Sequence, residues 1–191
     1  MPTTEKLRIQ RVHSDTVETD EDALVVETDV TIELDSVERF RATCSPDRLR
    51  DWAYGYLLSE GLITTADDVA EVREHDGSLS VRLTNSATSP PVPPEPVRSD
   101  QTLALDLLRA LAREVVDRAR LFRETGGTHA MAIATNEGLC THVEDISRAC
   151  ALEKALGAAL LAGIDFRRSL AFLSSRVPAR MIAKLARCGV P

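Results

Sequence analysis

Apolar and polar residues alternate along much of the first 84 residues, which predicts a unit built mainly from β-strands. Strands are expected at residues 7–12, 23–28, 30–34 and 37–43, joined as a meander, and at residues 69–74 and 79–83. Asp76-Gly77 separates the last two strands and is a typical hairpin turn. Ser45 and Pro46 predict the start of a helix that ends at Gly61. By this pattern, residues 1–84 form a small α+β unit.

The pattern changes after residue 84. Residues 85–99 hold five of the nine prolines and predict a linker, because proline fixes φ and lacks a backbone donor. A long amphipathic helix is expected from Thr102 toward Arg120 or beyond. Strands are then expected at residues 130–135, 139–143 and 170–173, with helices at residues 147–161 and 178–189. Alternating strands and helices predict a three-layer α/β domain over residues 100–191.

The composition is that of a globular protein, with 43% hydrophobic and 28% charged residues. The net charge is −7, but residues 1–100 carry 21 acidic and 10 basic side chains, whereas residues 101–191 carry 9 and 13. The acidic front half argues against nucleic acid as a partner, and the back half either suits a small anionic ligand or is solvated surface. Without an apolar signal region or an apolar run of about 18 residues, we expect a cytoplasmic protein with no membrane partner.

The cysteines form no CxxC pair; they are Cys44, Cys140, Cys150 and Cys188. In a cytoplasm they are expected to stay free thiols, either buried or incidental. Cys150 is the one weak candidate for chemistry, because a nearby Arg148 and a helix start both lower the pKa of a thiol. No metal site is expected, since His129 lacks the glutamate and the PCxxC partner of a deaminase-like zinc site.

Three short blocks fall where a predicted strand meets a helix or a loop. They hold the candidate ligand-binding residues Gly126, Gly127, His129, Glu144, Asp145, Arg148, Ser175 and Arg176. The glycines are either a helix C-cap or bare backbone that a ligand approaches closely. The histidine is either a packed, hydrogen-bonded side chain or a ligand contact. The two acids either cap free N–H groups of a helix or belong to the site.

The two arginines favour a ligand more strongly than the other candidates. Arg148 lies in a first helical turn, where the helix dipole disfavours a cation, and it could pair with Glu144 or reach a phosphate. Strand C-terminal ends line the crevice of an open sheet, so Arg148 and Arg176 are expected to face one crevice beside the glycines. Because arginine forks bind phosphate or carboxylate, the residues alone predict an anion-binding α/β domain.

Four ordered blocks resemble the FdhD-type accessory proteins of formate dehydrogenase. They are Thr125–Ala130, the Glu144-Asp145-Ile146-Ser147-Arg148 block with Glu153-Lys154, the Ser174-Ser175-Arg176 block with its following helix, and the Gly55-to-Gly61 stretch. The resemblance covers most of residues 20–191. It implies a cytidine-deaminase-like domain behind the N-terminal unit, often in a homodimer. It also implies a sulfurtransferase that takes sulfur from a cysteine desulfurase and serves formate dehydrogenase, with a molybdopterin guanine dinucleotide-type cofactor, carrying molybdenum or tungsten, as bound client.

Departures from the family pattern lead us to expect impaired sulfur transfer. The family's CxxC loop corresponds to residues 85–99, which hold no cysteine, and a persulfide needs a thiolate. The family's terminal strand–helix–strand, with its cofactor-contacting segment, would follow Pro191. The family's R-H-N is Arg148-Ala149-Cys150, and its S-G-R is Ser174-Ser175-Arg176. No catalytic residue carries over.

Two alternatives of the same descent stay open: a non-catalytic nucleotide- or pterin-binding or interaction module, and a remnant without a biochemical role. A sheet ending at residues 189–191 is expected to expose a strand edge and one face of the helix at residues 147–161. This predicts association through the back half, with another copy or a partner chain.

Overall fold

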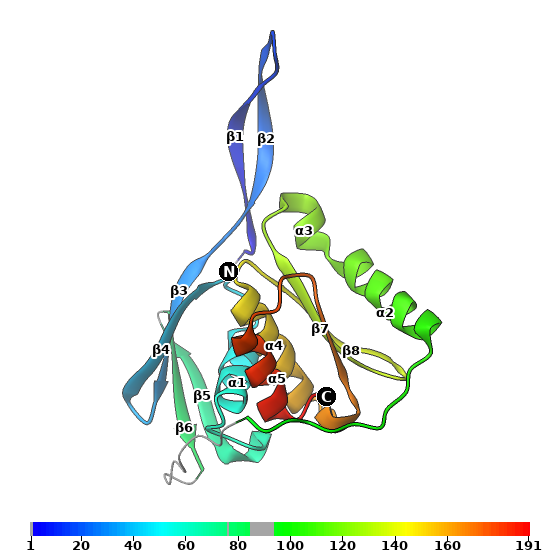
Figure 1. The fold of residues 1–191 in the computed structure, drawn as a ribbon. Coiled ribbons are helices and arrows are strands. Elements are labelled where there is room, and N and C mark those ends of the chain that lie inside the picture. Colours follow the sequence, from blue (N-terminus) through cyan, green and yellow to red (C-terminus); the bar gives the residue numbers. More distant parts are fainter. Residues whose placement is uncertain (1, 76, 85–93) are drawn as a thin grey trace.

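The computed structural model describes residues 2–75, 77–84 and 94–191 (Figure 1). In this part of the chain the strands are β1 (Thr4–Val12), β2 (Val17–Val25), β3 (Thr28–Leu34), β4 (Val37–Cys44), β5 (Val69–His75), β6 (Ser78–Leu83), β7 (His129–Thr135), β8 (Gly138–Asp145) and β9 (Leu170–Leu173). The helices are α1 (Leu49–Ser59), α2 (Leu105–Arg118), α3 (Arg120–Thr125), α4 (Arg148–Leu161) and α5 (Ala179–Cys188), with short 3-10 helices η1 (Ala66–Asp68) and η2 (Phe166–Arg168). The predicted α+β class is confirmed.

The strands of the front half form two sheets rather than the expected meander. β1 and β2 form a separate hairpin that projects from the body (Figure 1). The other sheet has the order β4-β3-β6-β5, in which β3 pairs parallel with β6 and places Ile32 opposite Leu79. Alternation predicts which residues form strands, but the choice of neighbour depends on which apolar faces meet across the sheet.

The helix α1 begins later than the sequence suggested. Arg48, in the left-handed region with φ of 53°, is the residue before its first turn, and Ser45 is not the cap. The side chain of Ser45 is instead drawn into contacts with the back half of the chain. The predicted end is confirmed, since Gly61 follows the last turn with φ of 73°. The hairpin β5–β6 is also confirmed, although Asp76 of its turn lies outside the described residues.

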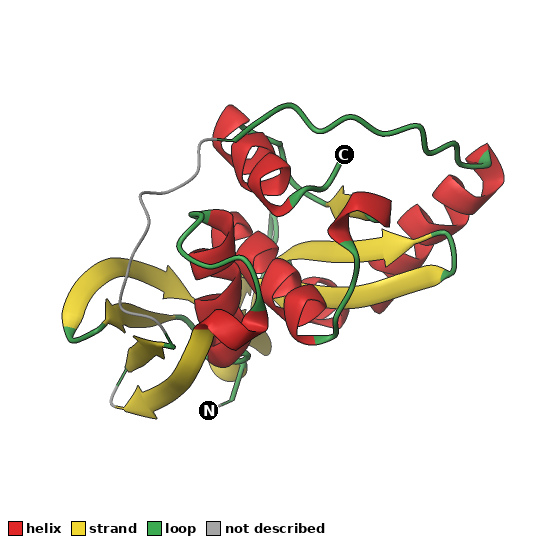
Figure 2. Cartoon of the chain, turned by 90° about the horizontal axis from the view of Figure 1, so that it is seen from below, coloured by secondary structure: helices red, strands yellow, loops and turns green. Residues whose placement is uncertain are grey.

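The back half is a three-layer arrangement, as predicted. Its sheet has the order β8-β7-β9, with β7 antiparallel to both neighbours. Met131 and Ile133 of β7 belong to the core cluster that includes α4, whereas Ala130 and Ala132, of opposite pleat, pack with Val115 of α2. Figure 2 shows helices on both sides of these strands.

The expected long helix is interrupted. Ala119, with ψ of 72°, separates α2 from α3. The free N–H groups of α3 are capped by Glu144, a residue that the sequence suggested as a cap for the following helix, α4. Of the predicted linker, residues 85–93 lie outside the described residues, and residues 94–99 have no regular secondary structure.

The main hydrophobic core joins residues from both halves of the chain. Trp52 and Leu57 of α1 are fully buried and share one cluster with Leu156 of α4 and Met181 of α5. Gly55 and Gly157 lie where α1 and α4 meet, and their backbones touch. The predicted boundary at residues 85–99 therefore separates the halves in sequence, but the core crosses it. No helix in the described ranges is long and apolar enough to cross a membrane.

Candidate ligand-binding site

The candidate site is built at one edge of the back sheet. Because β7 is antiparallel to both neighbours, its first residues lie beside the last residues of β8 and β9. His129 is opposite Asp145, and Met131 is opposite Leu173. The three predicted blocks therefore meet at this edge, although they are far apart in sequence.

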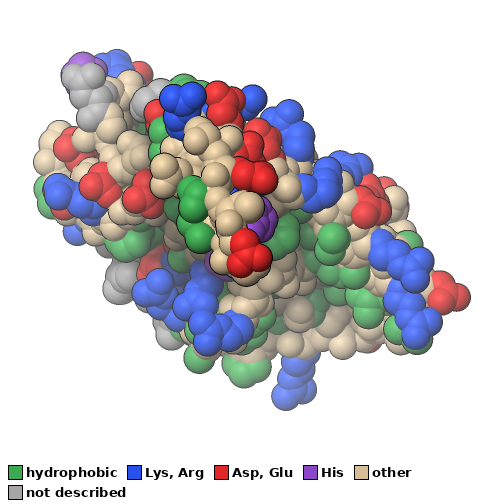
Figure 3. All heavy atoms as spheres, turned by 90° about the horizontal axis from the view of Figure 1, so that it is seen from above, with side chains coloured by type: hydrophobic (Ala, Val, Ile, Leu, Met, Phe, Trp, Pro, Cys, Tyr) green, Lys and Arg blue, Asp and Glu red, His purple; other side chains and the backbone are tan. Residues whose placement is uncertain are grey.

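A cavity of about 430 Å³ opens at this edge. Gly126, Gly127 and His129 line it, together with Ser174, and its other walls are mainly apolar side chains of Val115, Val116, Ala119 and Phe122. Figure 3, seen from the side of the β1–β2 hairpin, shows hydrophobic side chains on this face of the molecule. The cavity therefore offers a flat or apolar group more contacts than it offers an anion.

The two glycines have structural reasons as well as a place in the cavity. Gly126 follows the last turn of α3 with φ of 67°, so it is the C-cap that one interpretation predicted. A Cβ on Gly127 would lie 3.1 Å from Cγ2 of Val25, because this valine of β2 packs against the loop that contains Gly127. The C-cap interpretation is therefore confirmed for Gly126. The pair also lines the cavity, and the approach of a ligand to its backbone stays a prediction.

The predicted arginines lie outside this cavity. Arg176 is exposed and Arg148 half-buried, and neither guanidinium group makes a hydrogen bond or an ion pair with any residue that the structure describes. The proposed pairing of Arg148 with Glu144 is not formed. Ser175 donates its hydroxyl to the carbonyl of Arg176, 3.2 Å away, and it is Ser174 that lines the cavity.

Ser174 is a residue that sequence reasoning missed. Its Oγ accepts a hydrogen bond from the backbone N–H of Ala130 at 2.8 Å, and its own N–H donates to the Ala130 carbonyl. The side chain therefore continues the β7–β9 pairing for one residue beyond β9. The double serine in the sequence signals a hydroxyl at this point, but only the strand register shows which serine is used.

Glu144 is a helix cap. Its carboxylate accepts from the backbone N–H groups of Leu121 at 3.0 Å and Phe122 at 2.7 Å, and from the hydroxyl of Thr128 at 3.1 Å. The two N–H groups are free donors of the first turn of α3, which a carboxylate satisfies. The capping interpretation was right for this residue, but the capped helix is α3 rather than α4.

Asp145 is completely buried and paired. Lys154 Nζ lies 2.6 Å from its carboxylate, and the backbone N–H of Ser147 donates to it at 2.7 Å. The N–H of Ser45 donates to the same carboxylate, while the Ser45 carbonyl accepts from Lys154 at 2.8 Å. Burial raises the pKa of Asp145, an effect that the nearby ammonium opposes. Asp145 thus links Ser45, just before α1, to Lys154 of α4, and its carboxylate is not available to a ligand.

A second buried charge cluster joins α1, α4 and α5. Lys184 Nζ lies 2.8 Å from Glu153 and also pairs with Glu60, and Trp52 donates its indole N–H to Glu153 at 2.7 Å. Burial raises the pKa of Glu153, and Lys184 opposes that rise. The two side chains of the Glu153-Lys154 motif thus belong to different ion-pair clusters: Glu153 pairs with Lys184, and Lys154 pairs with Asp145. The motif was visible in the sequence, but its structural role was not.

Cys150 does not have the environment of a reactive thiol. It is 1% exposed, and a side-chain hydrogen bond with Cys44 together with burial raises its pKa. The expected lowering by Arg148 and the helix start is therefore wrong: the thiol points into the core, where the thiolate is disfavoured. Ser147 does cap the helix, accepting from the N–H of Cys150. Within the described ranges, no group of three or more His, Cys, Asp or Glu could hold a metal.

Fold and site together define a mixed α+β protein with a small cavity at the strand ends of a three-stranded sheet. The family model described as FdhD/NarQ matches residues 25–92 and 86–191, which is most of the chain. The chain therefore belongs to the FdhD/NarQ family.

Relatives and a solved structure agree with this assignment. A sulfur carrier protein FdhD from Methanothermobacter thermautotrophicus is 32% identical over 88% of this chain and 74% of the relative. One of the same name from Burkholderia mallei is 29% identical over 97% of this chain and 81% of the relative. A crystal structure from Desulfotalea psychrophila, provisionally assigned as a formate dehydrogenase accessory protein, superposes with a TM-score of 0.85 at 23% identity. It covers 100% of this chain and 81% of that one, and it supports the fold.

Proposed function

We propose that this protein is an accessory protein of formate dehydrogenase in the sulfur-carrier class. The observation that carries the proposal is the family match across residues 25–92 and 86–191, with relatives named as sulfur carrier proteins. The charged family motifs around Glu144, Glu153 and Lys184 hold the fold together, so their presence supports a shared framework rather than a particular reaction.

We further propose that sulfur transfer through a cysteine of this chain is impaired. Residues 85–99 contain no cysteine. Cys44 and Cys150 are buried, and burial raises the pKa of Cys188 to about 12, so a thiolate is disfavoured at Cys150 and Cys188. Cys140 is half-buried on β8, with its Sγ near the hydroxyl of Thr135. A sulfur carrier needs an accessible thiolate, and Cys150 and Cys188 lack that environment.

The direct test is sulfur loading. The purified chain is incubated with a cysteine desulfurase and L-cysteine, and its intact mass is compared with that of a CxxC-containing relative treated in the same way. We expect the relative, but not this chain, to gain sulfur that is removed by a reductant. A reducible sulfur adduct on this chain, lost in one of the four single Cys→Ser variants, would show that transfer is retained and would identify its carrier.

Complementation tests the accessory role itself. The gene is expressed in a strain that lacks its own accessory protein, and formate dehydrogenase activity is measured against the strain's own protein and an empty vector. Restored activity without sulfur loading would support an accessory role that does not use a cysteine of this chain. Failure in both assays would leave a binding module or a remnant without a biochemical role.

The second candidate is a non-catalytic binding module, and the cavity beside Gly126 and His129 is the observation that favours it. Its volume is at the small end of ligand pockets, so it suits one heterocycle of a pterin or nucleotide rather than a whole dinucleotide. Arg148 and Arg176 lie at the same sheet edge, and their guanidinium groups have no partner among the described residues, so they are free to contact phosphate groups outside the cavity.

Calorimetric titration with guanine nucleotides tests this candidate. Losing one charge-assisted hydrogen bond costs about 1.5–3 kcal/mol, so Arg148→Ala and Arg176→Ala are each expected to weaken binding roughly ten- to a hundredfold. Arg120→Ala, an exposed arginine on α3, is the matched control. Binding that neither variant weakens would place the nucleotide elsewhere, and no binding at millimolar ligand would remove this candidate.

We also propose that the chain associates through its back half. The two surfaces expected from the sequence do not carry this proposal, because residues 189–191 form no strand and α4 is mostly buried. Other surfaces do: Val116 and Phe122 are 63% and 51% exposed on α2 and α3, and β9 is an edge strand of its sheet. Light scattering at micromolar concentration is expected to give the mass of a dimer. A monomer that melts cooperatively would contradict the proposal.

A further inference from the structure

Two adjoining cavities lie at the opposite end of α5 from the candidate site. The helix runs from Ala179, three residues after Arg176, to Cys188, a length of about 15 Å. Around its last turn a cavity of about 500 Å³ is bounded by the end of α1, residues 95–98 and η2. A second cavity of about 440 Å³ continues between residues 98–103 and η2. Arg98 and Arg167 line both, so the two form one continuous groove.

The groove gathers positive charge on an acidic protein. Four arginines line it, Arg98, Arg167, Arg168 and Arg187, against two carboxylates, Glu95 and Asp100, whereas the whole chain has a net charge of −7. We call these four residues the arginine groove. Guanidinium groups gathered from three separate elements repel one another unless an anion neutralises them.

Three of the four guanidinium groups have no partner within the part of the chain that the structure describes. Arg187 donates to the Ser59 carbonyl at 2.8 Å, so it is engaged in holding α5 to α1. The side chains of Arg98, Arg167 and Arg168 make no hydrogen bond or ion pair with the described residues. Some arginines elsewhere do pair, as Arg118 does with Glu114, whereas the side chains of Arg148 and Arg176 likewise have no partner among the described residues. The groove therefore holds donors that remain open to a ligand.

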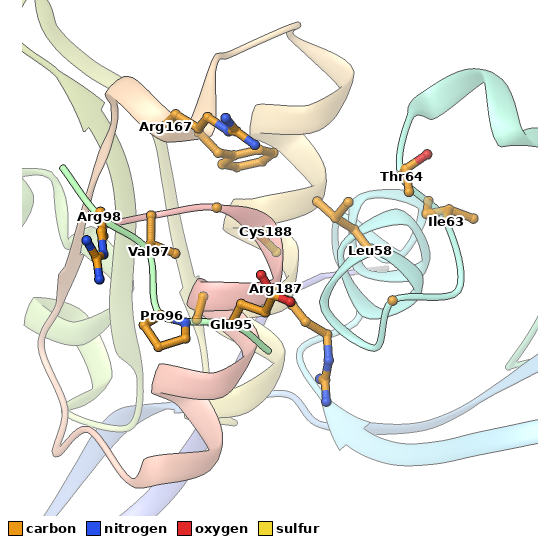
Figure 4. A pocket seen from close by; sticks show the side chains of 14 residues that line it. Leu58, Ile63, Thr64, Glu95, Pro96, Val97, Arg98, Arg167, Arg187 and Cys188 are labelled. Atoms are coloured by element: carbon orange, nitrogen blue, oxygen red, sulfur yellow. The ribbon is translucent and has the colours of Figure 1, made fainter. Parts of the chain in front are cut away.

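The larger cavity also has an apolar wall. Figure 4 shows Leu58 and Ile63, from α1 and the loop after it, on one side, with Arg98 and Arg167 on the other. Phe166 of η2 also lines this cavity and is mostly buried. A ligand that fits both walls has an anionic part and a flat or apolar part.

We propose that the arginine groove binds a phosphorylated small molecule of the nucleoside polyphosphate class. The phosphate chain lies where the cavities join, between Arg98, Arg167 and Arg168, because arginine forks match phosphate oxygens. The organic part lies against Leu58 and Ile63. Arg98 belongs to the segment before α2, whereas Arg167 belongs to η2, which follows α4. A ligand that contacts both arginines therefore links the segment before α2 to η2. This site is separate from the cavity beside Gly126.

The experiment uses the full chain at low ionic strength, with inorganic tripolyphosphate and ATP as calorimetric probes. Both are expected to bind, with ATP tighter because only ATP reaches the apolar wall. Arg98→Ala and Arg167→Ala are each expected to weaken both probes roughly tenfold or more. Arg113→Ala and Arg120→Ala, exposed arginines outside the groove, are the matched controls. Arg176→Ala reports separately on the candidate site at the other end of α5, and a melting curve of each variant verifies that it is folded.

Three results would overturn the proposal. The first is no heat of binding for either probe at millimolar concentration. The second is equal weakening by the groove variants and the controls, which would indicate only general attraction to positive charge. The third is weakening by Arg176→Ala alone, which would place both probes at the other end of α5. Hydrogen exchange gives an independent readout, because slower exchange of residues 95–103 on adding ATP is expected only if the groove is occupied.

Discussion

Replacing Gly55 by alanine is predicted to destabilise the protein even though alanine is the better helix former. Gly55 lies in α1 where this helix crosses α4. A Cβ built on it would lie 1.7 Å from the carbonyl oxygen of Glu153 and 2.8 Å from the backbone nitrogen of Gly157. Both opposing atoms are backbone, so no side chain can rotate away, and the helices must separate by roughly 1.5–2 Å to reach ordinary contact.

The magnitude follows from two opposing effects. Alanine stabilises a helix interior by about 1 kcal/mol relative to glycine. Overpacking a close contact costs about 1–3 kcal/mol, and more when the backbone has to move, as it must at this crossing. A separation of 1.7 Å from a backbone oxygen puts the overpacking cost at or above the top of that range, so we expect a net loss of about 2 kcal/mol. For a chain of this size that corresponds to a fall of roughly 4–8 °C in the melting temperature.

Urea unfolding and thermal melting of Gly55→Ala measure this loss, with Ala158→Gly on α4 as a control for helix propensity. Gly157→Ala faces the same crossing, since its Cβ would lie 1.9 Å from the Asp51 carbonyl oxygen. Once one alanine has separated α1 from α4, the Cβ of the second alanine clashes less with the opposing backbone. The double variant should therefore cost less than the sum of the single variants.

A Gly55→Ala variant that melted at the wild-type temperature or above it would refute this prediction. That result would mean that α1 and α4 are not held in backbone contact, and close helix packing would then no longer account for the glycine in the Gly55-to-Gly61 family block. Additive losses in the double variant would contradict the shared crossing while leaving the single clashes intact.

Three further predictions concern the charged and titrating groups. Lys154→Met leaves Asp145 buried without its cation and should cost about 3–5 kcal/mol in urea unfolding, whereas Lys6→Met on the exposed hairpin should cost little. Glu144→Ala removes the acceptor for two backbone donors of α3 and should cost about 1–2 kcal/mol, with faster hydrogen exchange confined to α3; unchanged exchange there would contradict the capping role. Burial raises the pKa of Cys188 from 9.0 to about 12 and that of Tyr56 from 10.0 to about 12. The unfolded chain loses these protons first, so stability should fall as pH rises from about 9 to 12, and a Cys188→Ser variant with the same slope between pH 9 and 10 as wild type would exclude the thiol as a source.

Much of the local structure could be predicted from the sequence because short-range rules govern it. The period of apolar residues located the strands around Ile32 and Met131 and the helices α4 and α5. Gly61 and Gly126 were recognisable as helix ends because an αL position favours glycine. The three-layer back half followed from the order of strands and helices, and the four blocks pointed to the family from residue spacing alone.

Tertiary structure decided the roles of the polar residues, because their partners lie far away in the chain. Ser45 satisfied every local rule for a helix cap, yet its N–H is used by Asp145, 100 residues away. Glu144 and Cys150 carried local signals for a ligand and for a reactive thiol, but burial and neighbouring elements made one a cap and the other a core residue. The arginine groove left no local signal, since its arginines come from three elements that only folding brings together.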